Sequence, residues 1–240
     1  MNQLENLSSG LKSDHQNSVY PVKKPLTASQ SGDVSACIET VSGRLVNPTN
    51  PLAENITLSD IAWATSRIPR FAGHTITEVP YNVAQHSVYV AELAAEMIIN
   101  KSKIIEIEQS LIVIRSGNII ETLIKALLHD AHEAYTGDIP SPVKRIPELR
   151  ETLKIIEMKL DHAIFSAFNL PELTDSERIL IKYCDRLAQA IESYQFMPSR
   201  GLNWNLPAPT LVALQKFPQP KSPLLSYENF ISHYNYLLEQ

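Results

Sequence analysis

The sequence predicts an all-α protein, a helical bundle that carries one small β-hairpin near its N-terminus. Apolar residues recur with three- and four-residue spacing in several long segments, which is the periodicity of one helix face. Capping residues and prolines separate these segments. The 240 residues, 44% of them hydrophobic, suffice for one globular domain with a core of its own.

The N-terminal region divides into a tail and a hairpin. Residues 1–34 are rich in Ser, Asn, Gln and Lys and hold few large apolar side chains, so we expect a flexible tail. The domain then covers residues 35–240. Its first element is a short β-hairpin around the turn Ser42–Arg44, followed by a short helix at residues 59–66 that ends before Pro69.

Two helices form the middle of the chain. The first begins at Asn82, which caps it together with Gln85, three residues later. A polar, exposed loop that contains Gly117 follows. A central helix then runs from about residue 118 to residue 135. It ends at Gly137, because glycine suits the position after a helix and the prolines that follow prevent continuation.

Three more helices are expected in the C-terminal half, at residues 148–167, 174–194 and 227–238. Thr174 and Glu177 form a capping box for the second of them. Residues 198–223 hold six prolines, so we expect a loop there.

Composition limits the function and the location. The formal net charge of −5 argues against a general nucleic-acid-binding face, but an anionic small substrate remains possible if a metal ion and local cations meet it. The two cysteines, Cys37 and Cys184, imply no disulfide framework, so a cytoplasmic location is expected. No apolar run approaches a membrane span, and the first ten residues lack a signal-peptide pattern. We therefore expect neither a membrane partner nor a stable nucleic-acid partner.

Acidic and imidazole side chains are concentrated in ten residues of the central segment: His129, Asp130, His132, Glu133 and Asp138. On a helix, Asp130 and Glu133 share one surface. Placing an imidazole and a carboxylate at the edge of an apolar stripe costs free energy unless their polar atoms have partners. A divalent cation bound by both side chains is such a partner. The alternative is a solvated surface pair without metal. Two further ligands elsewhere in the chain would favour the metal site over the surface pair.

Two such residues occur in apolar helical contexts. His86 lies in the first long helix, and Asp185 lies in the helix that begins at Thr174. Each has a simpler explanation, since His86 could be a satisfied core histidine and Asp185 half of an ion pair with Arg186. If neighbouring helices bring both to the His129–Asp130 pair, the mixed nitrogen and oxygen ligands suit Mn²⁺, Fe²⁺, Co²⁺, Ni²⁺ or Zn²⁺ better than Ca²⁺.

The order of these residues resembles the signature of the HD-domain metal-dependent phosphohydrolases. The flanking segments 81–88 and 126–144 are similar to the bacterial HD 5′-deoxynucleotidases and their phage relatives, some of which hydrolyse deoxyadenosine triphosphate. Segments 42–44, 60–64 and 69–74 resemble the phage-type branch. The resemblance covers about residues 38–197 and implies an HD-domain helical bundle.

The resemblance also implies roles for individual residues. The metal ligands would be His86, His129, Asp130 and Asp185. Glu133 matches the glutamate that orients or activates the attacking water. Asp138 matches the aspartate proposed as general acid or base near the scissile bond.

Substrate contacts are implied in the same way. Arg70 matches an arginine that clamps phosphate, a task suited to its planar fork. Phe71 departs from the family pattern, because deoxynucleotidases often carry Trp at this position, which bears on stacking or sugar discrimination. Lys144 is a third candidate for substrate binding. Weaker candidates are His74 and Gln189, whereas His132 is expected to be an exposed neighbour and Arg67 a surface cation.

Three functional hypotheses follow. The first is a 5′-deoxynucleotidase that converts a deoxynucleoside monophosphate to nucleoside and phosphate by direct water attack. The second is a deoxynucleoside triphosphate triphosphohydrolase that prefers dATP. The third, from another class, is a nucleotide-binding module without catalysis. For all three we expect a nucleotide as small-molecule partner, and we expect a homo-oligomer.

Overall fold

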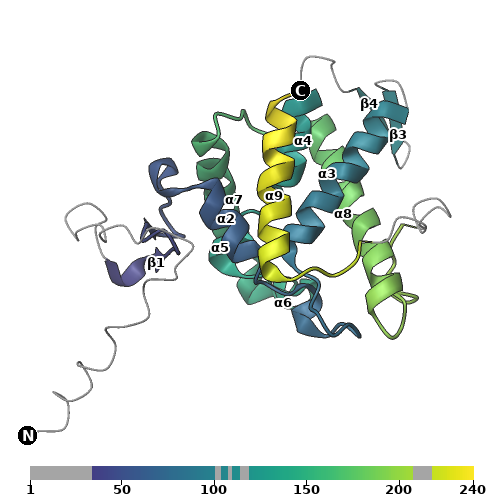
Figure 1. Cartoon of the computed structure of the whole chain (residues 1–240), viewed down its shortest axis with the longest axis horizontal. Coiled ribbons are helices and arrows are strands. Elements are labelled where there is room, and N and C mark those ends of the chain that lie inside the picture. The colour runs from purple at the N-terminus through teal and green to yellow at the C-terminus, as the bar shows by residue number, and fades with distance from the viewer. Residues whose placement is uncertain (1–33, 101–103, 108–109, 114–118, 208–217) are drawn as a thin grey trace, which may run out of the picture.

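The computed structural model describes residues 34–100, 104–107, 110–113, 119–207 and 218–240, and it confirms the all-α bundle with an N-terminal hairpin. The expected tail lies outside these ranges except for residue 34. Helix α3 (Val83–Asn100) is central and packs against α4 (Ile119–Leu127), α8 (Asp175–Phe196) and α9 (Pro223–Leu238). Figure 1 shows these helices side by side, with α9 in yellow.

The N-terminal hairpin forms where the sequence predicts it. Its strands are β1 (Ile38–Glu39) and β2 (Leu45–Val46), which pair antiparallel. Asp60 ties the hairpin to α2 (Leu58–Thr65), because its carboxylate accepts hydrogen bonds from the backbone N–H and the hydroxyl of Ser42 at 3.1 and 2.7 Å. Helix α2 packs on α9, so the hairpin is attached to the bundle through α2. Short 3-10 turns accompany these elements: η3 (Val34–Ala36), η4 (Ala53–Asn55) and η5 (Arg70–Gly73).

The start of α3 is fixed by the expected cap. The Asn82 side chain accepts a hydrogen bond from the Gln85 backbone N–H at 3.1 Å. The Gln85 side chain does not complete a capping box. Its amide instead donates to the Gln219 carbonyl at 2.8 Å and accepts from the Lys221 backbone N–H at 3.0 Å. Asn82 also donates to the Ser226 hydroxyl at 2.9 Å, so the first turn of α3 is joined to the start of α9.

The central helix is interrupted. The prediction of one continuous helix from about residue 118 to residue 135 is therefore wrong. Helix α4 ends at Leu127, residues 128–132 form turns, and helix α5 (Glu133–Thr136) follows. Gly137 ends α5 with a φ of +76°, as expected for a glycine after a helix. The apolar spacing continues across the break, which is why periodicity alone gave a continuous helix.

The prediction of a polar, exposed loop after α3 is also wrong in part. Strands β3 (Ile104–Ile107) and β4 (Ser110–Val113) pair antiparallel there. Their sequences are rich in isoleucine and valine, which favour strands, but no glycine or asparagine marks the turn. Gly117 lies outside the described residues.

The C-terminal helices form largely as predicted. Helix α6 (Ser141–Lys144) is a single turn that the sequence did not indicate, and α7 spans Pro147–Ala167. The apolar stripe of α7 is buried only at its C-terminal end, since Leu160 is fully buried and Leu149 is 42% exposed. The Thr174–Glu177 capping box is present at α8. Helix α9 begins four residues earlier than expected, at Pro223, and residues 208–217 of the expected loop lie outside the described residues.

One continuous core lies between α2, α3, α4, α7, α8 and α9. Its fully buried members include Ile61, Val90, Leu127, Ile164 and Leu180. Among the described helices, none is both long enough and apolar enough to cross a membrane.

Candidate metal centre and active site

The four expected metal ligands converge at the middle of the bundle. His86 comes from α3, Asp185 from α8, and the His129–Asp130 pair from the turn after α4. The Nε2 atom of His86 lies 3.1 Å from Asp185 Oδ1 and 3.5 Å from Asp130 Oδ2. The Nε2 atom of His129 lies 3.2 Å from the same Asp130 oxygen. The ligand atoms of His86, His129 and Asp130 therefore lie within 4.8 Å of one another, and Asp185 joins this group through its contact with His86.

The imidazole orientations fit a metal ion. His129 Nδ1 lies 2.9 Å from the Ala126 carbonyl, which can only accept, so Nδ1 carries the proton and Nε2 presents a lone pair. That Nε2 is buried and has no hydrogen-bond partner although the Asp130 carboxylate is adjacent. A lone pair facing a carboxylate oxygen is unfavourable without a proton or a cation between them. The residues present therefore fit a divalent cation held by mixed nitrogen and oxygen ligands.

Glu192 completes this centre, and sequence reasoning missed it. Its Oε1 atom lies 2.7 Å from His86 Nδ1, and its Oε2 accepts a hydrogen bond from Arg70 Nε at 3.2 Å. Both Glu192 and His86 are fully buried. A carboxylate on the outer nitrogen of a ligating histidine fixes its tautomer and raises its basicity. The available signal was the spacing, because Glu192 follows Asp185 by seven residues and so lies on the same face of α8.

Charge in this buried network is strongly coupled. Burial and the Arg70 charge lower the pKa of His86, but Glu192 and Asp185 outweigh them and raise it to about 10. Burial raises the pKa of Glu192, but His86 and Arg70 outweigh it and lower the pKa below its usual value. Arg70 also lies 3.6 Å from Asp130, measured from Nη1 to Oδ2. Arg70 and Glu192 thus join the four expected ligands in one network of buried charges.

The two expected catalytic carboxyls lie beside this centre. Glu133 is 3% exposed and one of its oxygens has no hydrogen-bond partner. Burial, followed by the neighbouring Asp130 and Asp138, raises the pKa of Glu133 to about 9. Burial also raises the pKa of Asp138, although Arg70 opposes the shift. Both groups therefore hold a proton more readily than an exposed carboxyl does.

His132 is buried, so its expected exposure is wrong. Its exposed fraction is 7%, and its Nδ1 lies 2.9 Å from Asp161 Oδ1 on α7.

Lys144, expected to bind substrate, forms an ion pair with Glu157 at 2.9 Å and lies 3.9 Å from Glu133. These contacts join α6 and α7 to the catalytic side of the bundle and partly offset the Lys144 charge.

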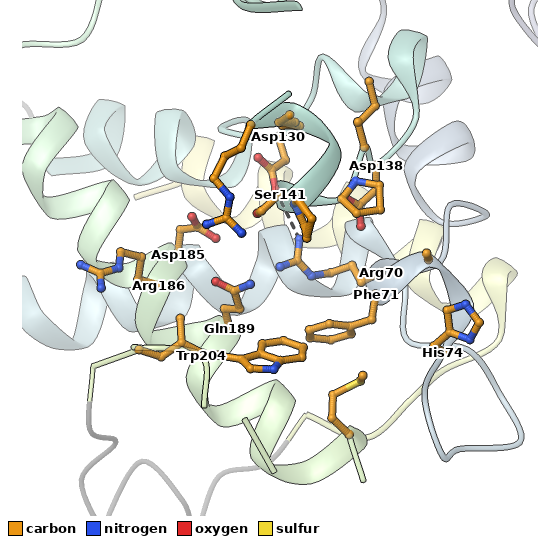
Figure 2. Close-up of a pocket in the computed structure, with 18 of the residues that line it drawn as sticks. Arg70, Phe71, His74, Asp130, Asp138, Ser141, Asp185, Arg186, Gln189 and Trp204 are labelled. Carbon is orange, nitrogen blue, oxygen red and sulfur yellow. Dashed lines mark ion pairs between the residues drawn. The ribbon is translucent and has the colours of Figure 1, made fainter. Parts of the chain in front are cut away.

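A large pocket opens over the centre. Its volume is about 950 Å³, within the usual range for small-molecule sites. Arg70, Phe71, His74, Lys144 and Gln189 line it, as do the four acids Asp130, Glu133, Asp138 and Asp185. Figure 2 shows Arg70 between Asp130 on one side and the rings of Phe71 and Trp204 on the other. Arg67 is not among the lining residues; it is exposed, and its guanidinium lies 3.4 Å from the ring centre of Trp63.

Comparison with known proteins identifies the family. A sequence model described as 5′-deoxynucleotidase YfbR-like matches residues 64–198, more than half of the chain. The chain belongs to the YfbR-like family. The uncharacterized protein YfdR of Escherichia coli K12 is 30% identical over 206 residues, covering 84% of this chain and 96% of YfdR. The 5′-deoxynucleotidase VP0926 of Vibrio parahaemolyticus is 35% identical over 97 residues, covering 39% of this chain and 43% of VP0926.

The chain is also similar to a solved structure. It is the HD phosphohydrolase DatZ of cyanophage S-2L, bound to dA and one catalytic Zn²⁺ ion, with 21% identity, a TM-score of 0.44, and coverage of 74% of this chain and 98% of that one. As a YfbR-like protein, the chain is an HD-superfamily phosphohydrolase that acts on nucleotides. The matched residues of the YfbR-like model include Arg70 and Glu192, whereas Trp204 lies beyond them.

Proposed function

We propose that this YfbR-like enzyme hydrolyses deoxynucleoside 5′-monophosphates to deoxynucleoside and inorganic phosphate. The convergence of His86, His129, Asp130 and Asp185 next to Arg70, at one end of an open pocket, carries the proposal. These four side chains would hold one divalent cation, with Zn²⁺, Mn²⁺, Co²⁺, Ni²⁺ or Fe²⁺ as the candidates. When bound, such a cation neutralises phosphoryl oxygens and acidifies water.

Arg70 is positioned to bind the phosphoryl group. Its Nε is engaged by Glu192, and its Nη1 lies 3.6 Å from Asp130, so the guanidinium is fixed from behind while it lines the pocket. The fully buried Glu192 carboxylate maintains the Arg70 charge in a site that would otherwise disfavour it. Donors held in place before the reaction stabilise charge that develops on non-bridging oxygens without reorganisation.

Glu133 and Asp138 divide the proton transfers. In the proposed reaction, Glu133 accepts a proton from water as the water oxygen bonds to phosphorus. Asp138 donates a proton to the 5′ oxygen as the bond from phosphorus to that oxygen breaks. The raised pKa of Asp138 suits a general acid, which must still hold its proton near neutral pH. The pKa of Glu133 is raised to about 9, so Glu133 would act as a base only when the charge of a bound divalent cation lowers that pKa.

The charge of the pocket suits a phosphate anion. Among the described residues, four acids and the cations Arg70, Lys144, Arg145 and Arg186 line it. Because burial favours the protonated forms of Glu133 and Asp138, the four acids do not fully offset the four cations, and a divalent cation would add further positive charge. Arg145 and Arg186 favour the second candidate, a dNTP triphosphohydrolase. Their positive charges suit additional phosphates, and the pocket volume leaves room for a longer phosphate chain.

Product analysis tests both candidates. Purified protein loaded separately with Mn²⁺, Co²⁺ or Zn²⁺ is incubated with dNMPs, NMPs and dNTPs, and phosphate, pyrophosphate and triphosphate are measured. We expect phosphate from dNMPs. Inorganic triphosphate from dATP would favour the second candidate, and no product with any metal would reject both. The homo-oligomer and the cytoplasmic location remain predictions.

A further inference from the structure

Trp204 presents a large aromatic surface to the pocket, far in sequence from the metal centre. It lies in the segment after α8, beyond residues 64–198 that match the family, and it is 37% exposed. Its indole lies 5.8 Å from the Phe71 ring, measured between ring centres, with an angle of 46° between the planes. The tilted pair leaves ring surface open to the pocket, as Figure 2 shows.

The segment that carries Trp204 is held against α8. The Trp204 backbone N–H donates to the Gly201 carbonyl at 3.1 Å. Gly201 has a φ of +68° and lies so close to Ser193 that a Cβ atom at this position would collide with the serine hydroxyl. Arg186 on α8 donates to the Asn205 carbonyl at 3.1 Å. Contacts on both sides therefore position the backbone that carries Trp204.

The other half of the pair is placed by an unusual backbone turn. Phe71 and Ala72 have φ values of +55° and +51°, and Gly73 follows with +78°. Non-glycine residues adopt this left-handed conformation at a cost, and such strain persists where surrounding contacts impose it. The turn directs Arg70 toward Glu192 and Asp130 while the adjacent Phe71 ring reaches Trp204.

The pocket thus has two chemically different ends. Carboxylates and Arg70 form one end, and the two aromatic rings form the other. The guanidinium carbon of Arg70 lies 5.6 Å from the centre of the Phe71 ring, so the two ends adjoin. Gln189 also lines this pocket, and its side-chain amide can donate hydrogen bonds through NH₂ and accept them through its carbonyl oxygen. A nucleotide has the same arrangement, with an anionic phosphate at one end and a flat base at the other.

We propose that Trp204, together with Phe71, is the nucleobase-stacking site of this enzyme. The proposal rests on the proposed function for the placement of the phosphate at Arg70. Stacking of a base on an aromatic side chain contributes about 1–3 kcal/mol and tolerates different bases. Removal of the indole should therefore weaken nucleotide binding about 5- to 150-fold. Stacking acts in both the ground state and the transition state, so the loss should fall on KM.

Fluorescence tests the contact without requiring turnover. The chain has two tryptophans, so Trp63→Phe leaves Trp204 as the single indole. Trp63 packs against Tyr227 and is not among the residues that line the pocket. Metal-loaded Trp63→Phe protein is mixed with dAMP, dCMP or deoxyribose 5-phosphate in a stopped-flow instrument and read before turnover. We expect both nucleotides, but not the sugar phosphate, to quench the emission.

Kinetics separate stacking from a structural role. Trp204→Ala should raise KM for dNMPs about 5- to 150-fold, with kcat nearly unchanged, and should leave kcat/KM for deoxyribose 5-phosphate unchanged. Trp204→Phe should restore most of the loss. Leu202→Ala is the matched control, because Leu202 lies in the same segment and is 82% exposed. An equal loss of kcat/KM for the nucleotide and the sugar phosphate would overturn the stacking role.

The outcomes also separate this inference from the proposed function. Hydrolysis of dNMPs without quenching of Trp204 would overturn the stacking site and leave the hydrolase assignment standing. Quenching by nucleotides without phosphate release would support the base site and reject hydrolysis of the monophosphates. The absence of both signals would reject both.

Discussion

Replacement of Glu192 by glutamine should weaken both the metal centre and the fold. The carboxylate faces His86 with one oxygen and accepts from Arg70 Nε with the other, and the side chains of Glu192 and His86 are fully buried. A glutamine has a single acceptor oxygen, so its NH₂ group must face one of these two donors. Loss of one partner of a buried ion pair costs about 3–5 kcal/mol. At about 2–4 °C per kcal/mol for a domain of this size, the melting temperature should fall by roughly 6–20 °C.

The effect on metal affinity is the more specific readout. Loss of the carboxylate behind a ligating histidine typically costs 10- to 100-fold in affinity or activity. The ionised form of the pair is favoured near neutral pH, because the pKa of Glu192 is lowered and that of His86 is raised to about 10. A measurement at pH 7 therefore compares the intact pair with its loss. Mass spectrometry gives metal content, and a competing chelator gives affinity.

The chain provides a matched control for this experiment. His162 and Glu172 form the same type of pair at the same Nδ1 to Oε1 distance of 2.7 Å, but their side chains are 77% and 65% exposed. Glu172→Gln should change stability by less than about 1 kcal/mol, because exposed ion pairs contribute little. If Glu192→Gln binds metal and melts as the wild type does, the reasoning about the buried network is refuted.

Four further substitutions test other parts of the structure. Asp130→Ala should abolish turnover and lower bound metal, whereas Glu133→Ala should lose turnover and keep most metal; equal metal and turnover in the Asp130 variant would remove it from the centre. Ala72→Gly should stabilise the protein by about 1 kcal/mol in chemical denaturation, because glycine adopts a φ of +51° without strain; a loss of stability would contradict the strain. Glu177→Gln should cost about 3 kcal/mol, because the buried Lys125 loses one of its two carboxylates. Burial raises the pKa of Glu177, but the Thr174 backbone and Lys125 outweigh it and lower the pKa, so this contribution is present above pH 4.5 and lost as the pH falls further; a pH series of unfolding free energies should show the variant and wild type converge in acid.

Local signals in the sequence were sufficient for much of the fold. The caps at Asn82 and Thr174 depend on residues three positions apart, and both occur in the structure. The hairpin β3–β4 was missed because its turn lacks the glycine or asparagine that would have marked it. Strand pairing of this kind depends on packing against α3 and α8, which a single sequence does not display.

The candidate site could be predicted from the sequence only in part. The ligand order from His86 to Asp185 came from a family resemblance, and the structure brings these residues together. Glu192 was missed because a glutamate in a helix usually faces solvent, and only the rotation of α8 in the bundle buries it. Trp204 was missed because its segment lacks a periodic pattern, so nothing local indicates that it returns to the pocket.

The break after α4 explains why an apparent error in the helix prediction coincides with the site. In a continuous helix, His129 and Asp130 would point about 100° apart, which makes it difficult for both to face one ion. The turns at residues 128–132 let the His129 ring bind the Ala126 carbonyl through Nδ1 while its Nε2 and Asp130 Oδ2 approach within 3.2 Å. The apolar residues on both sides of the break, Leu127 and Ala131, remain buried, so the core is preserved. The backbone thus gives up helical hydrogen bonds at the position where the centre requires two adjacent residues to act together.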